Sequence, residues 1–213
     1  MIKGVIFDLD GVLCHTDEYH YLAWKKISDS NNWYFDREIN NRLRGISRVD
    51  SLKVILNENK VDISKELFEE ILVLKNKYYL ELLENMSKKD LDNGVFETLN
   101  YLIDNEVKMC VASSSKNAPV ILSKLGIKDL FEIIIDGNMI TKSKPNPEVF
   151  SKAFEVLNIN EKECLIVEDS KVGVEASNIL GIPSVYMGKE ENVNATYIIY
   201  KIEDLIEIFQ GDK

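Results

Sequence analysis

Several short groups of polar residues in this sequence carry side chains that could do chemistry. Asp8-Leu9-Asp10-Gly11 follows a short apolar run near the N-terminus. Two carboxylates separated by one residue can point to the same side of an extended segment. Close like charges raise each other's pKa unless a cation lies between them, and oxygen-rich sites of this kind suit Mg²⁺. Glu168 and Asp169 supply further carboxylates. The two acidic pairs together indicate a metal site.

A serine-rich segment and a lysine offer groups that could hold an anion. The segment Ser113-Ser114-Ser115-Lys116-Asn117 precedes a predicted helix, whose early Pro119 suits a first turn. Hydroxyls and backbone N–H groups at a helix start can bind an anion, although serine and asparagine are also common as simple helix caps. Lys144 stands before Pro145, which favours an extended, poised conformation. A fixed ammonium can neutralise a phosphoryl oxygen or a carboxylate, whereas most lysines are only solvated surface residues.

The apolar runs before these groups predict the elements that position them. The runs are short and rich in β-branched residues, and they cover 2–7, 107–112, 132–135, 163–168 and 183–187. Amphipathic helical patterns lie between them, at roughly 94–105, 119–125, 147–157, 172–180 and 202–209. This alternation predicts an α/β fold with a Rossmann-like parallel sheet covered on both faces. Ligands bind beyond the carboxyl ends of the strands in such a sheet, so we expect the polar groups to meet there.

A different region interrupts this alternation after the first strand. It contains no convincing strand run, and its helical patterns fall at 18–30, 36–43, 49–57 and 65–83. The region is far longer than an ordinary connection, so we expect an inserted all-helical cap domain. The predicted division is an α/β core of residues 1–16 and 87–213 with a cap of residues 17–86. Two linkers in parallel would make a natural hinge.

The composition limits the partners. The 213 residues carry a formal net charge of -10, which disfavours binding to nucleic acid or to an anionic membrane. A small phosphorylated ligand can still bind where a metal and local donors override the mean field. No run approaches the roughly 20 apolar residues of a membrane span. The three cysteines are widely spaced and suggest neither a disulfide framework nor a zinc site. We expect a cytoplasmic protein without a signal peptide, and a monomer because a two-linker cap must move freely.

In this order, the polar groups resemble the four motifs of the haloacid dehalogenase superfamily. The first motif is matched by DLDGV at 8–12 and the second by Ser113. The third is matched by Lys144 in SKPNPEVF and the fourth by Glu168-Asp169 in IVEDS. The resemblance covers essentially the whole chain, including a helical cap in the family's first cap position.

This resemblance implies roles for the core residues. Asp8 would be a nucleophile that becomes an aspartyl phosphate, and Asp10 would be the general acid/base. Asp10 also separates members that transfer phosphoryl groups from the dehalogenases. The implied Mg²⁺ ligands are Asp8, the Asp10 carbonyl and Asp169, with Glu168 either binding the ion or lying beside it. Ser113 and Lys144 would hold the transferring phosphoryl group.

Several cap and loop segments further resemble the β-phosphoglucomutases. These segments are HTDEYHYLAWK at 15–25, RLRGISRVDSL at 42–52, LKNKYY at 74–79 and ASSSKNAP at 112–119. The resemblance implies interconversion of β-D-glucose 1-phosphate and D-glucose 6-phosphate through glucose 1,6-bisphosphate, which also primes the enzyme. The implied substrate contacts are Thr16, His20, Arg44, Gly45, Arg48, Ser51, Lys75, Ser114, Ser115, Lys116 and Asn117. His15 and Arg44 depart from the family pattern, in which an acidic residue and a lysine are common at these positions.

Charge considerations agree with this resemblance but leave alternatives open. A bisphosphate has two charged ends, so its second phosphate needs cations of its own, a task that Arg48 fits. A lid that closes on that phosphate expels water and favours return of the phosphoryl group to sugar.

Arg44 and Arg48 could also form a solvated face. A Mg²⁺-dependent sugar-phosphate phosphatase would use the same core chemistry. A non-catalytic sugar-phosphate-binding module is disfavoured, because it would need no nucleophile with a matched acid/base.

Overall fold

The computed structural model describes residues 1–211 of the chain, and its contacts divide into two compact units. One unit consists of residues 1–15 together with the chain from Ser87 onward, and the other is Thr16–Met86. Thr16 therefore belongs to the second unit rather than to the predicted core. The reason is local, since the Thr16 hydroxyl accepts a hydrogen bond of 3.0 Å from Tyr79 of that unit.

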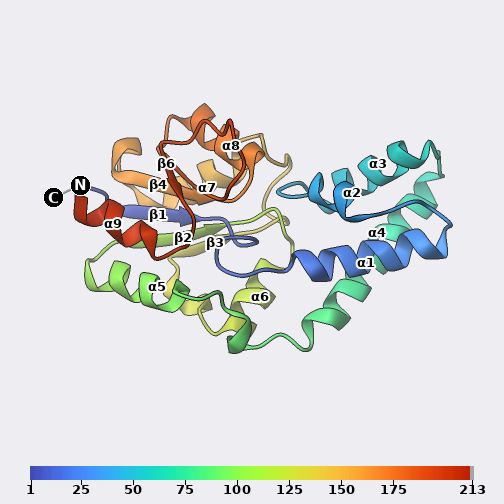
Figure 1. The fold of residues 1–213 in the computed structure, drawn as a ribbon, viewed down its shortest axis with the longest axis horizontal. Helices are drawn as coiled ribbons and strands as arrows, with labels where there is room; N and C mark the ends of the chain where they lie inside the picture. The colour runs from blue at the N-terminus through green and yellow to red at the C-terminus, as the bar shows by residue number, and fades with distance from the viewer. Residues whose placement is uncertain (212–213) are drawn as a thin grey trace. The chain divides into compact units, whose positions relative to one another are not determined.

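The first unit is built on a six-stranded sheet in the order β3-β2-β1-β4-β5-β6 (Figure 1). The strands are β1 Gly4–Phe7, β2 Lys108–Ala112, β3 Ile133–Ile135, β4 Cys164–Glu168, β5 Ser184–Met187 and β6 Tyr197–Ile199. All neighbouring strands pair in parallel. This is the predicted α/β fold, and its first strand lies at the centre, between β2 and β4.

The register of the three central strands aligns their carboxyl ends. Phe7 of β1 pairs with Val111 of β2 on one side and with Val167 of β4 on the other. The backbone ladder continues one residue further, because Asp8 N–H donates to the Val167 carbonyl at 2.9 Å. The residues that follow these strands are therefore brought to one edge of the sheet, where parallel sheets bind their ligands.

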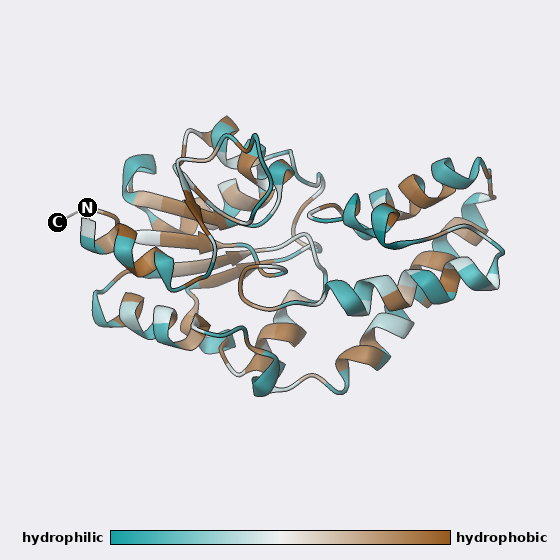
Figure 2. Ribbon diagram, viewed as in Figure 1, coloured by the Kyte–Doolittle hydropathy of each residue, from teal (hydrophilic) through white to brown (hydrophobic). Residues whose placement is uncertain are grey.

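Helices cover both faces of this sheet. The helices of the first unit are α5 Val95–Asp104, α6 Ala118–Leu125, α7 Glu148–Leu157, α8 Lys171–Leu180 and α9 Asp204–Gly211. Short 3-10 turns lie at η1 Lys88–Asp90, η2 Lys128–Leu130 and η3 Glu161–Glu163. Helices α7 and α8 lie on one face, while α5, α6 and α9 lie on the other (Figure 1). The central strands β1 and β4 are apolar apart from Glu168 at the end of β4, as buried parallel strands are expected to be (Figure 2).

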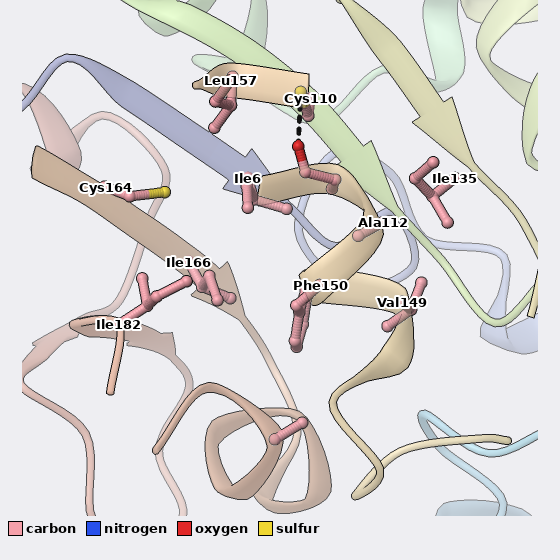
Figure 3. Packing of buried hydrophobic residues seen from close by; sticks show 12 residues of the cluster. Ile6, Cys110, Ala112, Ile135, Val149, Phe150, Leu157, Cys164, Ile166 and Ile182 are labelled. Carbon is pink, nitrogen blue, oxygen red and sulfur yellow. Dashed lines mark hydrogen bonds between the residues drawn. The ribbon is translucent and has the colours of Figure 1, made fainter. Parts of the chain in front are cut away.

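The core on the α7 side is closely packed. Ile6, Cys110 and Ile166 come from three adjacent strands and meet Phe150 and Leu157 of α7 (Figure 3). All five of these side chains have no exposed surface. Burying an aliphatic or aromatic side chain of this kind stabilises a fold by about 1.5–3 kcal/mol. This packing fixes α7, and with it the loop that carries Lys144, against the sheet.

The last strand, β6, was not predicted from the sequence. It is short and lies at an edge of the sheet, where only Ile199 is buried. Tyr197 and Ile198 are 39% and 52% exposed. A half-solvated edge strand of this length lacks the continuous apolar run that marks the central strands. The other predicted strands are present, with ends shifted by one or two residues.

The second unit is entirely helical and has its own core. Its helices are α1 Asp17–Ser30, α2 Arg37–Asn41, α3 Arg48–Asn59 and α4 Lys65–Leu83. Trp24, Leu52 and Ile71 are among the buried residues at its centre. Ser47 and Ser64 cap α3 and α4 by accepting hydrogen bonds from backbone N–H groups of the first turn. None of the helices in the described part of the chain could cross a membrane, because each is too short or too polar.

Candidate active site

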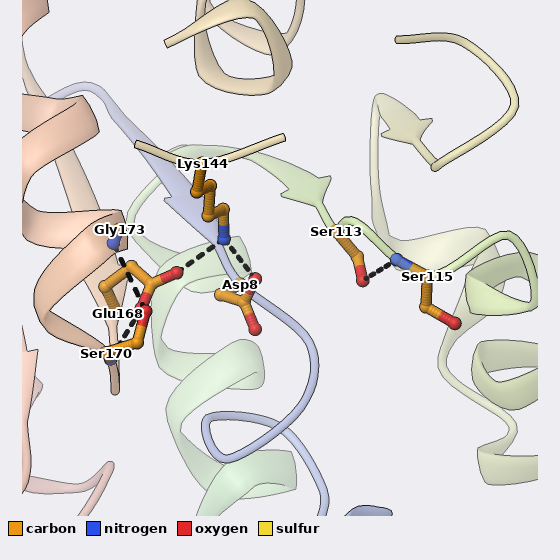
Figure 4. A network of polar contacts seen from close by, with 7 residues as sticks. All are labelled: Asp8, Ser113, Ser115, Lys144, Glu168, Ser170 and Gly173. Carbon is orange, nitrogen blue, oxygen red and sulfur yellow. Dashed lines mark hydrogen bonds and ion pairs between the residues drawn. The ribbon is translucent and has the colours of Figure 1, made fainter. Parts of the chain in front are cut away.

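A buried lysine joins two carboxylates at the carboxyl edge of the sheet (Figure 4). Asp8 follows the end of β1, and Glu168 is the last residue of β4. The Lys144 ammonium donates to Asp8 Oδ1 and to Glu168 Oε1, and all three side chains are buried. The loop before α7 therefore places its one buried cation between the ends of two adjacent strands.

Ser170 and Gly173, which the sequence analysis did not single out, hold the Glu168 carboxylate. The Ser170 N–H and hydroxyl both donate to Glu168 Oε2 at 2.7 Å. The Ser170 hydroxyl also accepts from the Gly173 N–H at 3.2 Å and so caps α8. A Cβ atom on Gly173 would lie 2.0 Å from Glu168 Cδ, so any side chain there would displace the Glu168 carboxylate. A serine directly before a helical pattern was the available signal for this cap.

Three carboxylates at this edge fit a hard divalent cation. One oxygen from each of Asp8, Glu168 and Asp169 lies within 4.8 Å of the others. Carboxylate oxygens are the donors that Mg²⁺ and Ca²⁺ prefer. Gly11 has a φ of +87°, and a Cβ atom there would lie 2.1 Å from Asp169 Oδ2. The loop after Asp8 thus passes very close to the Asp169 carboxylate. Asp10, partly buried in the same loop, is not part of this group of side-chain oxygens.

Burial and charge shift the titration of the central pair. Burial is the main cause that raises the pKa of Asp8 to about 7; Lys144 opposes it, and the charges of Glu168 and Asp10 add to it. Burial lowers the pKa of Lys144, but the charges of Asp8 and Glu168 outweigh it and hold that pKa above its ordinary value. Lys144 therefore stays charged at neutral pH, while an additional positive charge would favour the ionised form of Asp8.

The serine-rich loop lies beside Asp8, after β2. Ser113 N–H continues the sheet ladder to the Ile135 carbonyl at 2.9 Å. The Ser113 hydroxyl accepts from Ser115 N–H at 3.1 Å, and the Ser115 hydroxyl accepts from Asn117 N–H at 3.3 Å. A hydroxyl that accepts one bond still has a proton to donate. Both hydroxyls can therefore shape the loop and also serve a ligand. Ser114 is partly buried and Lys116 is exposed.

The helical unit gathers part of the predicted substrate set around Tyr79. Lys75, only 2% exposed, places its ammonium 2.7 Å from His20 Nδ1 and 4.5 Å from the centre of the Tyr79 ring. The His20 ring packs on Tyr79 with centroids 4.2 Å apart, and the Tyr79 hydroxyl donates to Thr16. Tyr79 was not predicted, although it follows Lys75 by one helical turn in α4. These side chains come from α1, the residue before it and α4, and together they form a polar cluster.

The remaining predicted cap residues have other partners. Arg48 donates to Asn76 Oδ1 at 2.7 Å and to the Leu72 carbonyl at 3.4 Å, so it lies against α4. Arg44, predicted as a sugar contact, forms an ion pair with Asp17 at the surface. The buried Ser51 hydroxyl donates to the Ser47 carbonyl within the first turn of α3. Gly45 adopts a φ of 73° in the turn before that helix.

Replacing Lys144 with methionine should destabilise the protein strongly. The change leaves two buried carboxylates without their cation, which costs about 3–5 kcal/mol of unfolding free energy. Urea unfolding in the presence of EDTA measures this loss. Lys3→Met is the matched control, because Lys3 pairs with Glu163 at the surface with its side chain 57% exposed. An exposed pair contributes about 0–1 kcal/mol. Equal losses in the two variants would contradict the buried ion-pair network.

Gly173→Ala should weaken divalent-cation binding, even though alanine is the better helix former by about 1 kcal/mol. The new methyl group displaces Glu168, whose Cδ lies 2.0 Å from its position. Disturbing residues that orient metal ligands costs about 10–100-fold in affinity. Titration calorimetry with Mg²⁺ measures the change. Gly211→Ala is the control, because no atom lies within 4 Å of a Cβ there. Unchanged affinity in Gly173→Ala would refute the role given to Glu168.

His20 should make the protein less stable as the pH falls. Burial lowers the pKa of His20 well below 6.5, and the charges of Lys75 and Arg48 lower it further. Below pH 6.5 the unfolded chain binds a proton that the folded protein does not. Stability contributed by neutral His20 is thus present above that pH and declines below it. Between pH 7.5 and 5.5, His20→Gln should lose about 1 kcal/mol less unfolding free energy than the wild type. Urea unfolding at both pH values measures these losses. Equal losses of unfolding free energy in the variant and the wild type would disprove the prediction.

Comparison with known proteins agrees with the fold. The family model for haloacid dehalogenase-like hydrolases matches residues 5–187. The chain is 37% identical to a β-phosphoglucomutase of Bacillus subtilis over 96% of its own length and 92% of that protein. It is 27% identical to a phosphorylated carbohydrates phosphatase of Thermotoga maritima, over 87% of this chain and 84% of the relative.

A solved structure shows the same arrangement of elements. The crystal structure of a β-phosphoglucomutase from Clostridium difficile matches 99% of this chain and 96% of its own, with a TM-score of 0.93 and 35% identity. The four sequence motifs, the parallel sheet that aligns them and the match along residues 5–187 lead to one conclusion. This chain belongs to the family of haloacid dehalogenase-like hydrolases.

Proposed function

We propose that this protein is a Mg²⁺-dependent β-phosphoglucomutase, which interconverts β-D-glucose 1-phosphate and D-glucose 6-phosphate through glucose 1,6-bisphosphate. The observation that carries the proposal is the 37% identity to the Bacillus subtilis β-phosphoglucomutase over 96% of the chain, helical unit included. The buried Lys144–Asp8–Glu168 network supports the chemical step. A small phosphorylated sugar is the substrate class that follows.

The proposed nucleophile is Asp8. One of its oxygens forms a bond to phosphorus while the bond between phosphorus and the sugar oxygen breaks, which gives an aspartyl phosphate and a sugar hydroxyl. Asp10 gives the proton that the leaving sugar oxygen needs. In the reverse sense, Asp10 takes the proton of the attacking hydroxyl, the new oxygen–phosphorus bond forms and the Asp8–phosphorus bond breaks. The two half-reactions together move the phosphoryl group between the two ends of the sugar.

Fixed donors next to Asp8 balance the charge of the transferring group. Lys144 is already held against Asp8 and would neutralise a phosphoryl oxygen without reorganising. Ser113, buried at the end of the neighbouring strand, can donate its hydroxyl proton to the same group. The positive charge of Lys144 is shared with Glu168, so the site needs further cationic charge for a phosphoryl group.

The donor set for Mg²⁺ would comprise Asp8, the Asp10 carbonyl and Asp169. Bound there, the ion would neutralise charge on the phosphoryl oxygens. Glu168 already accepts hydrogen bonds from Lys144 and, on its second oxygen, from the N–H and hydroxyl of Ser170. This engagement supports a role for Glu168 in positioning Lys144 beside the ion. The raised pKa of Asp8 fits a site that becomes ionised when such a charge is present.

The helical unit supplies the cations for the phosphate that does not react. Lys75 is the buried cation of its polar cluster, and Arg48 is a partly buried cation held against α4. Arg48 has a planar guanidinium that suits bidentate phosphate binding, and Asn76 orients it. Lys116 and Asn117 of the serine-rich loop would contribute from the α/β unit.

The purified protein should convert β-glucose 1-phosphate into glucose 6-phosphate when Mg²⁺ and catalytic glucose 1,6-bisphosphate are present. Glucose 6-phosphate and free phosphate are followed together, with the α anomer as a parallel substrate. Asp8→Asn should abolish the activity because the amide cannot form the aspartyl phosphate. Chelation with EDTA should also abolish it.

The same assay distinguishes the alternatives. Free phosphate without glucose 6-phosphate would refute the mutase and favour a sugar-phosphate phosphatase, an activity suggested by the similarity to the Thermotoga maritima phosphatase. Neither product, together with no Mg²⁺-dependent hydrolysis of an aryl phosphate, would favour a binding module.

A further inference from the structure

The loop after β3 contacts the serine-rich loop through Asn138. The Asn138 side chain donates from Nδ2 to the Lys116 carbonyl at 3.3 Å and to Asp136 Oδ2 at 3.3 Å. Its backbone N–H donates to Asp136 Oδ1 at 2.7 Å. Asp136 is 7% exposed and follows β3 directly, so it fixes Asn138 to the sheet. Asn138 in turn holds the backbone of Lys116.

Gly137 brings the two loops into direct contact. Its N–H donates to the Ser115 carbonyl at 3.2 Å. A Cβ atom on Gly137 would lie 2.3 Å from the Ser114 carbonyl oxygen and 3.1 Å from the Lys116 nitrogen. Gly137 is not among the glycines with positive φ, so its backbone would accept a side chain. Only the approach of the serine-rich loop requires glycine here.

The same loop is also anchored on its other side, against α7. One oxygen of Glu148 accepts from the N–H and the hydroxyl of Thr141 and from the N–H of Lys142, each at 2.9 Å. The segment between Asp136 and Lys144 is therefore tied to the sheet at one end and to α7 at the other. It can act as a fixed support for the loop that it touches.

We propose that Gly137 and Asn138 are positioning residues that set the place of Lys116 for the phosphate that is not transferred. The proposal rests on the proposed mutase function. A phosphorylated enzyme binds β-glucose 1-phosphate through a phosphate that does not react in that step. Lys116 is exposed, and its own carbonyl is held by Asn138 while the carbonyl of the preceding Ser115 is held by Gly137. The chemistry at Asp8 does not pass through these contacts, so they act on binding of the second phosphate and not on the transfer itself.

Asn138→Ala and Gly137→Ala test this proposal through two assays of one protein. Asn138→Ala removes the side-chain hydrogen bond to the Lys116 carbonyl, so it should raise the KM for β-glucose 1-phosphate about three- to tenfold. Its kcat should stay within about twofold of the wild type. Gly137→Ala should raise KM further, because its methyl group displaces the Ser114 carbonyl. Hydrolysis of para-nitrophenyl phosphate, which has only the transferring phosphate, should be unchanged in both variants.

Asn178→Ala is the matched control, since Asn178 also donates from Nδ2 to a backbone carbonyl, that of Asn194, at an exposed position of the same unit. It should change neither assay. An unchanged KM in both test variants would overturn the proposal. An equal loss of activity toward β-glucose 1-phosphate and toward para-nitrophenyl phosphate would also overturn it, because a merely structural defect lowers both activities. A wild-type protein that forms no glucose 6-phosphate refutes the proposed function itself, whereas an active wild type with unaffected variants refutes only the positioning role.

Discussion

The ammonium of Lys144, enclosed between Asp8 and Glu168, is the interaction around which the α/β unit is organised. Three buried ionic groups would be costly if any one of them lacked its partners. The protein meets this requirement with hydrogen bonds on each oxygen of Glu168, supplied by Lys144 and by Ser170. The arrangement leaves an excess of negative charge at the sheet edge, because Asp169 joins the group. A site of this charge is suited to a divalent cation and then to a phosphoryl group.

Close backbone approaches make this arrangement possible. Gly173 lets the first turn of α8 pass against Glu168, and Gly11 lets the loop after β1 pass against Asp169. Glycine elsewhere in a helix would only reduce its stability. At these two positions the missing side chain is what allows the carboxylates to occupy the space. Gly137 plays the same part between the two loops beyond β2 and β3. The lack of a side chain at these glycines is therefore as necessary to the site as its charged groups are.

The helical unit contains a polar cluster of a different kind. Lys75 is buried beside a neutral His20 and the face of Tyr79, where cation–π attraction and a hydrogen bond partly replace its lost hydration. The Tyr79 ring contacts both the Lys75 ammonium and the His20 imidazole and so holds them in fixed positions. Arg44 stands where a lysine is common in the family. Its guanidinium pairs with Asp17 at the start of α1, which gives the arginine a local role. Arginine also maintains a charge at this position.

The sequence by itself determined the strand–helix alternation, the helical insertion and the residues at the strand ends. Each central strand is buried on both faces, so it must read as an apolar run, and Asp8, Ser113 and Glu168 stand directly after or at the end of such runs. The edge strand β6 could not be predicted in this way because two of its three residues are exposed. Tertiary structure alone decided which distant groups became partners. Lys144 reaches Asp8 across 136 positions of sequence, and Tyr79 reaches Thr16 across 63. Periodicity reports which face of an element is buried, whereas the partner of a buried polar group depends on strand order and on how closely two backbones approach.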